Sequence, residues 1–522
     1  MLIDPHSVPE PAELEALCLG RTSLELADVR PAVERSRTLF LEALNRGETI
    51  YGSNTGYGPF VEFPATEDGG QDLLQHLLVG TGPLVSQQVV RGAIALRIWT
   101  MSRGFSGLRW EVIQAYVEAL RLCEAGLFPA VPVIGSLGAS GDLIPLAHLL
   151  NCIIGKGHWI ARGGVDLRAA RSIGGLGGRG DTNTAEDSRP ALLDPSSLDR
   201  RAALACTNGI SFSKAQATLA FVRLQRLLGI HEILVAALYA LLDSNPEHLH
   251  EELHSSSANA GTAMRIRRRL QTLLDLRGKE NSAEKRQGYA LQAPYSIRCA
   301  PQILGACFQG LDGVGGLLRH DLSMVDDNPL LDPDSGRLIH GGNFFGQSTA
   351  FAADQMATLA CQSGVLAERQ LALLLDPEFN ASGLMLATRP GISSGLAGLQ
   401  LKSTALVAEM RSLTGPHSTS SIPTNGKNQD IVPMSFLAAR RAYEVGDHLS
   451  SLLSALFIAI DEYWQYRFEV PVPLWKPDVS EGVEAAEGSQ AFQGSSSLGQ
   501  RLARIQSAFV QPEILDHENL QT

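Results

Sequence analysis

The chain contains few charged and few aromatic residues for its size. Charged residues account for 19% of its 522 residues and aromatic residues for 6%, whereas 44% are hydrophobic. A charged fraction below the usual ~25% indicates that much surface is buried, either in a large core or between subunits. The formal net charge of −12 also excludes the kind of basic surface that binds nucleic acid or an anionic membrane.

Cysteine is scarce and scattered. The 7 cysteines are odd in number and include no Cys-x-x-Cys pair, which excludes a disulfide framework and a zinc site and indicates reduced thiols. The segment Met1–His6 lacks the basic and apolar parts of an export signal. The most apolar stretch, Leu227–Leu242, contains His231 and Glu232 and is too short to span a bilayer. We therefore expect a soluble, cytoplasmic protein.

Strand signals are few, and neither alternating β/α units nor internal repeats are evident. Apolar residues instead recur with the helical period over stretches that are often longer than an average globular helix. The expected helices are Val85–Arg103, Trp110–Ala125, Leu143–Ile154, Ser213–Leu242, Ala263–Leu276, Pro301–Leu318, Thr349–Leu374, Gly395–Leu413 and Met434–Gln465. This pattern predicts a mostly α protein built around a bundle of long helices.

Two polar stretches interrupt the helical pattern. Arg162–Ser197 is rich in Gly, Arg, Asp and Ser, and Lys476–Gln500 is rich in Ser, Glu and Gly. Such compositions are typical of loops. We therefore predict a smaller, loop-rich α domain over residues 1–200, a central bundle of long helices over 201–470, and a C-terminal polar segment with a short helix over 471–522.

The tripeptide Ala139-Ser140-Gly141 carries the most specific chemical signal. The amide nitrogen of Gly141 can attack the carbonyl carbon of Ala139, because glycine has no Cβ to obstruct the approach and tolerates a strained turn. Loss of water from the ring, and of the Ser140 hydroxyl as a second water, leaves an exocyclic methylidene. That group is an electrophile, which none of the twenty side chains supplies. Alone, the tripeptide would far more often be an ordinary turn, so its surroundings decide.

The run Phe128–His148 around this tripeptide resembles the signature of the aromatic amino acid ammonia-lyases and 2,3-aminomutases. The resemblance implies that Ala139, Ser140 and Gly141 cyclise autocatalytically to 4-methylidene-imidazole-5-one, on the smaller N-terminal domain. It also implies no external cofactor and no metal. Addition of the substrate amine to this electrophile makes nitrogen a better leaving group.

The loop Tyr51–Gly58 resembles the family's Tyr-Gly-x-Asn/Thr-Thr-Gly-Phe-Gly loop, with Tyr57 in place of the usual Phe. The resemblance assigns Tyr51 as the base that removes the β-proton of the substrate, and places Gly58 among the substrate-binding residues. A phenol acts as a base only where its surroundings lower its pKa from about 10. We therefore expect the pKa of Tyr51 to be lowered.

Further segments match the family in the same order along the chain: Thr207–Gly209, Gln292–Gln302, His340–Gln347 and Asn428–Asp430. By this resemblance Asn208 helps to hold the substrate and the ring, and Tyr295 lies near the reacting centre. Arg298 offers a two-pronged guanidinium to the substrate carboxylate. The resemblance places these further residues in the substrate site: Gln292, Asn343, Phe344, Asn428 and Gln429.

The resemblance covers roughly Glu48 to Ile460, with some departures. Ala293 stands where the family usually has Asp, which puts the local support of Arg298 in question. Asp321 stands where a Glu commonly precedes the Asp-Asn-Pro element.

The segment Asp72–Pro83 aligns with the family's selectivity helix. Tyrosine lyases have His-Leu at the position of His76 and Leu77, phenylalanine lyases Phe-Leu and histidine lyases Ser-His. An imidazole can hydrogen-bond a para-hydroxyl, whereas a phenyl ring leaves that hydroxyl unpaired. Histidine lyases also have Glu where Gln429 falls. We therefore expect L-tyrosine as substrate and trans-p-coumarate as product, although His76 could instead be an ordinary core residue.

The resemblance leaves several activities open. A tyrosine or phenylalanine 2,3-aminomutase uses the same residues but re-adds the ammonia at Cβ, and a histidine ammonia-lyase shares the chemistry. From another class, the chain could be a non-catalytic helical scaffold, although intact Ser140, Tyr51 and Arg298 argue against it. Family enzymes are homotetramers whose active sites combine residues from three chains. We expect the same here, with a small aromatic amino acid as the partner molecule.

Three other patterns have simpler explanations or stay open. His250–His254 is a literal His-Glu-x-x-His zincin motif, but no third ligand follows at metzincin spacing, so we expect a solvated loop. Gly175–Gly180 fits Gly-x-Gly-x-x-Gly without the flanking strand and helix of a dinucleotide site. Lys402 is unusual for its helix and could bind an anion on the substrate or form a salt bridge.

Overall fold

The computed structural model of the chain describes residues 1–4, 7–65, 70–161, 191–254, 259–277, 292–474 and 497–509. Most of both expected polar stretches, Arg162–Ser197 and Lys476–Gln500, lies outside these ranges, and Gly175–Gly180 lies outside them entirely. The chain divides into two compact units. Unit 1 comprises Met1–Leu219, Gly316–Asp354 and Pro416–Arg440, and unit 2 comprises Ala220–Gly315, Gln355–Gly415 and Arg441–Thr522.

Unit 1 is built from short and medium helices connected by loops and two-stranded sheets. Its helices are α1 (Pro11–Cys18), α2 (Arg30–Asn45), α3 (Gly70–Leu77), α4 (Gln87–Ser102), α5 (Trp110–Glu124), α6 (Leu143–Ile153) and α8 (Arg200–Thr207). Its strands pair as β1 (Leu2–Ile3) with β2 (Glu25–Leu26), β3 (Thr81–Leu84) with β5 (Pro132–Ile134), β4 (Leu127–Pro129) with β6 (Trp159–Ala161), and β7 (Leu330–Leu331) with β8 (Leu338–Ile339). The β1–β2 pair is parallel and the other three are antiparallel.

Helix α4 lies at the centre of unit 1 and packs against α1, α2 and α5. It begins after Ser86, whose hydroxyl accepts a hydrogen bond from Val89 N at 3.4 Å, the arrangement of an N-cap. Nearly all of its residues are buried, including the charged Arg91 and Arg97. Because α4 is buried on nearly all sides, it is a core helix of unit 1.

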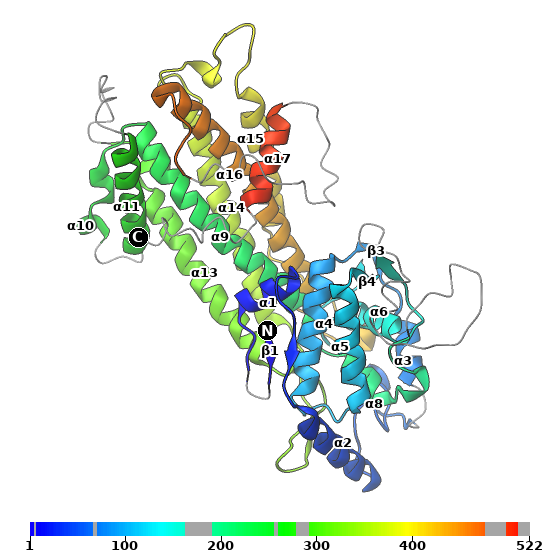
Figure 1. Cartoon of the computed structure of the whole chain (residues 1–522). Helices are drawn as coiled ribbons and strands as arrows, with labels where there is room; N and C mark the ends of the chain where they lie inside the picture. The colour runs from blue at the N-terminus through cyan, green and yellow to red at the C-terminus, as the bar shows by residue number, and fades with distance from the viewer. Residues whose placement is uncertain are drawn as a thin grey trace. The chain divides into compact units, whose positions relative to one another are not determined.

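Unit 2 consists of long helices that run side by side (Figure 1). The remaining α-helices among the described residues are α9 (Ser211–Leu241), α10 (Glu251–His254), α11 (Ala260–Arg277), α12 (Tyr295–Arg298), α13 (Ala300–Ser323), α14 (Gln347–Leu374), α15 (Ala397–Leu413), α16 (Ser435–Phe468) and α17 (Ser497–Phe509). The boundary between the units falls within α9, α13, α14 and α16.

Polar side chains connect the helices of unit 2. His231 on α9 bonds Ser363 on α14 at 2.8 Å, and Glu232 on α9 pairs with Arg265 and Arg269 of α11 at 2.9 and 2.7 Å. Burial lowers the pKa of His231 to about 4, so this ring is neutral at physiological pH. Buried polar groups must find such partners, because an unpaired one costs free energy.

The prediction of a mostly α protein with a bundle of long helices is confirmed, and every expected helix is present. The expected Pro301–Leu318 helix extends to Ser323, because Leu318 and Leu322 are still buried there. Helices α1, α2 and α8 were not expected. In α2 the charged residues mask a buried face made by Val33, Ser36, Phe40 and Ala43.

Helix α9 is long and apolar enough to cross a membrane, but 89% of its apolar window is buried within the structure. The apolar stretch Leu227–Leu242, which alone is too short to span a bilayer, belongs almost entirely to this longer helix. The burial of α9, and not its length, identifies it as a core helix.

Candidate active site

The turn Gly138–Asp142 precedes α6 and is tightly constrained. Gly138 and Gly141 have φ angles of +69° and +76°, a region that favours glycine. A Cβ on Gly141 would lie 2.2 Å from the carbonyl oxygen of Gly209. The Asp142 amide donates to that same oxygen at 2.7 Å. Position 141 therefore accepts only glycine without a shift of the backbone.

Asp142, the last residue of this turn, is fully buried and holds the turn in place. Its carboxylate accepts hydrogen bonds from Ser136 Oγ at 2.6 Å, Ser213 N at 2.8 Å and Ser213 Oγ at 2.7 Å. Burial raises the pKa of Asp142 to about 6, and the serine hydrogen bonds partly oppose that shift. The sequence interpretation gave no role to Asp142 or Ser213, although Asp142 directly follows the tripeptide.

Ser140 is held by side chains from two distant segments. Asn208 Nδ2 donates to the Ser140 carbonyl oxygen at 2.9 Å, and Gln429 Nε2 donates to Ser140 Oγ at 2.8 Å. The structure thus brings Asn208 and Gln429 to the tripeptide. The buried Oδ1 of Asn208 has no hydrogen-bond partner in the part of the chain that the structure describes.

A buried charge cluster fixes the Asn208–Gly209 segment. Arg97 donates to the Asn208 carbonyl oxygen at 2.7 Å and pairs with Asp326 at 3.4 Å, and Lys214 pairs with Asp326 at 3.2 Å. Burial alone would raise the pKa of Asp326, but Lys214 and Arg97 outweigh it and hold the pKa below its ordinary value. These residues were also missed from the sequence, because their contacts depend on tertiary packing.

A hydrogen bond from the backbone of the Tyr51 loop holds the Tyr51 hydroxyl. The Gly58 amide donates to Tyr51 Oη at 2.8 Å, and the Tyr51 amide donates to His340 Nε2 at 3.2 Å. Burial raises the pKa of Tyr51, and the Gly58 hydrogen bond only partly opposes this. The expectation of a lowered Tyr51 pKa is therefore wrong for a single chain, because desolvation of the phenolate dominates. His340 opens the matched segment His340–Gln347, yet was given no role of its own.

The Tyr51 loop packs against the turn Asn425–Lys427, which immediately precedes Asn428 and Gln429. A Cβ on Gly58 would lie 2.8 Å from Asn425 Nδ2. The two loops therefore bring Tyr51 and Gln429 to the same part of unit 1, and Gln429 reaches Ser140. Asn428 is exposed.

Asn343 and Phe344 are half-buried in unit 1. Asn343 Nδ2 donates to the carbonyl oxygens of Val325 and Asp327, the latter at 2.9 Å, so its amide group holds backbone. On α3, which packs on α6 and α8, Leu77 is buried and His76 is exposed. The exposure of His76 removes the alternative that it is a core residue.

Gln292, Tyr295 and Arg298 lie together in unit 2, on α12 and the segment before it. Arg298 donates to Gln292 Oε1 at 3.3 Å and lies over the Tyr295 ring at 4.7 Å. Tyr295 is 69% exposed. Among the described residues Arg298 forms no ion pair with a carboxylate, and its Nε has no hydrogen-bond partner. Ala293, which replaces the usual Asp, is buried.

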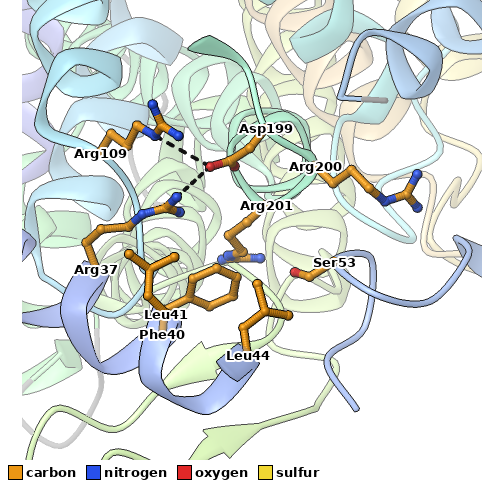
Figure 2. A pocket seen from close by; sticks show the side chains of 9 residues that line it. All are labelled: Arg37, Phe40, Leu41, Leu44, Ser53, Arg109, Asp199, Arg200 and Arg201. Atoms are coloured by element: carbon orange, nitrogen blue, oxygen red, sulfur yellow. Dashed lines mark hydrogen bonds and ion pairs between the residues drawn. The ribbon is translucent and has the colours of Figure 1, made fainter. Parts of the chain in front are cut away.

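A cavity borders α2, the Tyr51 loop and the start of α8 (Figure 2). It is lined by Arg37, Phe40, Leu41, Leu44, Ser53, Arg109, Asp199, Arg200 and Arg201. Asp199 pairs with Arg37 at 2.8 Å and lies 3.7 Å from Arg109. Arg200 lies 4.4 Å over the Tyr57 ring and donates to the Thr55 carbonyl oxygen at 2.9 Å. These charged side chains connect α2 and the Tyr51 loop to α8. Among the described residues that line this cavity, none was predicted from the sequence to form the active site.

Residues Glu251–His254 of the zincin-like motif form the short helix α10. His254 is buried and bonds the His248 carbonyl oxygen at 3.0 Å, so the expected solvated loop is wrong at this residue. In the described ranges no group of three or more His, Cys, Asp or Glu residues could hold a metal ion. Lys402 donates to Ser451 Oγ at 2.5 Å instead of forming the expected kind of salt bridge, and burial lowers the pKa of Lys402 to about 8.

The residues around Ser140 fit an intramolecular cyclisation. Within the described part of the chain the Gly141 amide nitrogen donates no hydrogen bond, so it is free to act as a nucleophile. Ala139 is buried beside it, away from competing water. The unpartnered Asn208 Oδ1 next to Ser140 is a polar atom that a rearranged ring could use.

A helical fold with this tyrosine loop, Ala-Ser-Gly turn and Asn-Gly segment is that of the ammonia-lyases and aminomutases. The chain matches the aromatic amino acid lyase family over residues 10–475 and belongs to that family. It is an enzyme, a carbon–nitrogen lyase.

Named relatives include lyases for different substrates. The chain is 34% identical to a tyrosine ammonia-lyase of Cupriavidus metallidurans, over 88% of this chain and 86% of the relative. It is 32% identical to a histidine ammonia-lyase of Vibrio cholerae, over 84% and 82% of the two chains. The crystal structure of a tyrosine aminomutase from Streptomyces globisporus superposes with a TM-score of 0.80 at 26% identity, covering 99% of this chain and 97% of that one.

Proposed function

We propose that the chain is an ammonia-lyase that converts L-tyrosine to trans-p-coumarate and ammonia. The observation that carries this proposal is the geometry of the Ala139-Ser140-Gly141 turn. Gly141 packs against the Gly209 backbone with its own amide unbonded among the described residues, and Asn208 and Gln429 donate hydrogen bonds to Ser140. The tyrosine assignment rests on His76, which is exposed on α3 and able to meet a para-hydroxyl. The tyrosine ammonia-lyase relative supports the same substrate.

The tripeptide supplies the cofactor. The Gly141 amide nitrogen bonds to the Ala139 carbonyl carbon with loss of that oxygen as water, and the Ser140 hydroxyl leaves as a second water with the Ser140 Cα proton. When formed, 4-methylidene-imidazole-5-one provides the electrophile that activates the substrate amine. The positive φ of Gly141 favours the compressed turn that this attack needs.

The remaining roles follow from charge and exposure. Arg298, which has no carboxylate partner among the described residues, binds the substrate carboxylate, and Tyr295 and Gln292 flank it. Tyr51 takes the β-proton through the oxygen that Gly58 holds. Asn208 holds the ring, while Asn343, Phe344, Leu77, Asn428 and Gln429 shape the substrate site.

The proposed assembly is a cytoplasmic homotetramer that shares its active sites between chains. Its support is the set of large apolar side chains that each unit leaves exposed, among them Ile392 at 79% and Leu401 at 75% in unit 2 and Ile422 at 67% in unit 1. Apolar side chains this exposed are typical of surfaces that another subunit covers.

The test is NMR analysis of the products that the purified enzyme forms from L-tyrosine, L-phenylalanine, L-histidine and L-dihydroxyphenylalanine. We expect trans-p-coumarate from tyrosine as the main product. Urocanate as the main product, from histidine, would refute the tyrosine assignment and support a histidine ammonia-lyase. A β-amino acid from tyrosine would identify an aminomutase, the second candidate, which is the activity of the similar Streptomyces globisporus enzyme. The Ser140→Ala variant is the matched control and should form none of these products.

A further inference from the structure

Helix α12 is too short to position Arg298 by itself. It spans only Tyr295–Arg298, and its own hydrogen bonds run from the Ile297 and Arg298 amides to Pro294 O and from the Cys299 amide to Tyr295 O. The carbonyl groups at the end of a helix have no partner within it. In a helix of a single turn, the carbonyl of Ser296 is therefore left for other groups, and the carbonyl of Ile297 has only the nearby Cys299 amide, which is shared with Tyr295 O.

Both carbonyls are bonded by buried side chains from the long helices of unit 2. Tyr239 on α9 donates its hydroxyl to the Ile297 carbonyl oxygen at 3.2 Å. Gln370 on α14 donates Nε2 to the Ser296 carbonyl oxygen at 2.8 Å. Both side chains are at most 1% exposed, so water does not replace these contacts.

The Gln370 amide is itself fixed by a chain of hydrogen bonds. His231 Nε2 lies 2.8 Å from Gln370 Oε1, and His231 Nδ1 lies 2.8 Å from Ser363 Oγ. Because an amide oxygen only accepts, Nε2 of His231 carries the proton and Nδ1 accepts from the serine. Ser363 Oγ thus donates to His231 Nδ1, His231 Nε2 donates to Gln370 Oε1, and Gln370 Nε2 donates to the Ser296 carbonyl oxygen. This chain of hydrogen bonds allows the Gln370 amide only one orientation.

We infer that Tyr239 and Gln370 are positioning residues for Arg298, and that together they aim its guanidinium at the substrate carboxylate. This inference rests on the proposed role of Arg298. Among the described residues, the side chain of Arg298 has only a 3.3 Å contact to Gln292 and the Tyr295 ring to guide it. Its direction is therefore set by the backbone turn that carries it.

The test compares Tyr239→Phe and Gln370→Met with Tyr463→Phe, using the better substrate of L-tyrosine and L-histidine. Tyr463 is the matched control, a buried tyrosine of unit 2 whose hydroxyl accepts from the Ala381 amide at 2.9 Å, away from α12. We expect KM to rise about 3- to 10-fold in the two test variants with kcat within about 2-fold, the size of one lost hydrogen bond. Tyr463→Phe should leave KM within about 2-fold of wild type.

A double-mutant cycle with Arg298→Gln separates positioning from general structure. If Tyr239 acts through Arg298, adding Tyr239→Phe to Arg298→Gln raises KM no further. Additive effects, or a Tyr239→Phe variant that behaves like Tyr463→Phe, would overturn the inference while Arg298→Gln alone still raises KM. If Arg298→Gln leaves KM unchanged, the proposed role of Arg298 fails and the inference fails with it. Should Tyr239→Phe not fold, Gln370→Met carries the same cycle.

Discussion

Tyr51 is the residue that we propose as the base. Its hydroxyl accepts the Gly58 amide, and the neighbouring Tyr57 lies edge-on with ring centroids 6.4 Å apart. We predict that Tyr51→Phe lowers turnover by roughly 10²-fold or more, because only the basic oxygen is lost. Steady-state kinetics with the Tyr57→Phe variant as control tests this. Tyr57 donates to the Arg200 carbonyl oxygen instead, so that variant should keep most of its activity, and equal losses in both would exclude Tyr51 as the base.

The pKa of Tyr51 also sets a pH dependence. Burial raises this pKa, so the phenol is mostly protonated near neutral pH and the basic form appears only as pH rises. We predict that kcat/KM increases with pH from about 7 to about 9 without reaching a plateau, because the raised pKa lies above the ordinary phenol value of about 10. A pH profile of kcat/KM measures it. A profile that is flat over this range would show that a group outside the single chain lowers the Tyr51 pKa, or that another residue is the base.

His76 tests the substrate at the level of one side chain. Its imidazole is exposed on α3 beside the buried Leu77. If it bonds the para-hydroxyl, His76→Phe removes an interaction of about 1–3 kcal/mol, and the ratio of kcat/KM for tyrosine over phenylalanine should fall roughly 10-fold or more. His320→Phe, at an exposed histidine of α13, is the control. An unchanged ratio in His76→Phe would remove the main support for tyrosine and leave the lyase chemistry untouched.

The turn before α6 is the element on which the electrophile depends. A Cβ on Gly141 would lie 2.2 Å from Gly209 O, where both partners are backbone and neither can move freely. We predict that Gly141→Ala does not cyclise and keeps its full encoded mass, whereas the wild-type chain is lighter by two waters. Intact-mass spectrometry checks this, with Gly313→Ala as control because a Cβ there meets nothing within 4 Å. A wild-type preparation that is active at its full encoded mass would refute the cyclisation.

Individual helices show what periodicity predicts and what it does not. The ends of α5 and α14 were predicted to within two residues, because each has a continuous apolar face that must be buried. Helix α8 is too short for such a face to be recognised: it buries the consecutive residues Ala202–Cys206, and beside them the buried Arg201 bonds the carbonyl oxygens of Ser106 and Asn328. An element held by a buried arginine looks polar in the sequence, so its prediction needs the tertiary partner.

In the candidate site, too, local sequence patterns could be recognised from the sequence, whereas tertiary contacts could not. Glycine-rich and Ala-Ser-Gly segments identify Tyr51 and Ser140 from sequence, because their chemistry needs particular residues in order. The pKa of Tyr51 was predicted in the wrong direction, since it depends on burial and not on the residue type. Arg97 and Asp326 were not predicted, because a buried ion pair between segments far apart in the chain leaves no local pattern.

At the scale of the whole molecule, the two units hold different parts of the predicted chemistry. Unit 1 contains Tyr51, Ser140, Asn208 and Gln429, and unit 2 contains Arg298. If the assembly is a homotetramer with shared active sites, Tyr51 and Arg298 of one site come from different chains. Two impaired variants, one lacking each residue, can then complement each other within a mixed tetramer, when activity is measured at a substrate concentration far below the raised KM of the Arg298→Gln chain.

We predict that co-expressing the Tyr51→Phe and Arg298→Gln chains restores activity to about a quarter of wild type, because random mixing gives about one site in four both native residues. Light scattering should show a tetramer for each chain alone and for the mixture. The control is Tyr51→Phe co-expressed with Ser140→Ala, which tests whether these two residues of unit 1 also come from separate chains. Gln429 contacts Ser140 and follows the turn that packs against the Tyr51 loop within one chain. We therefore expect no recovery of activity in this control mixture. No recovery in the first mixture, from chains that co-assemble, would place Tyr51 and Arg298 in one chain and refute the shared site.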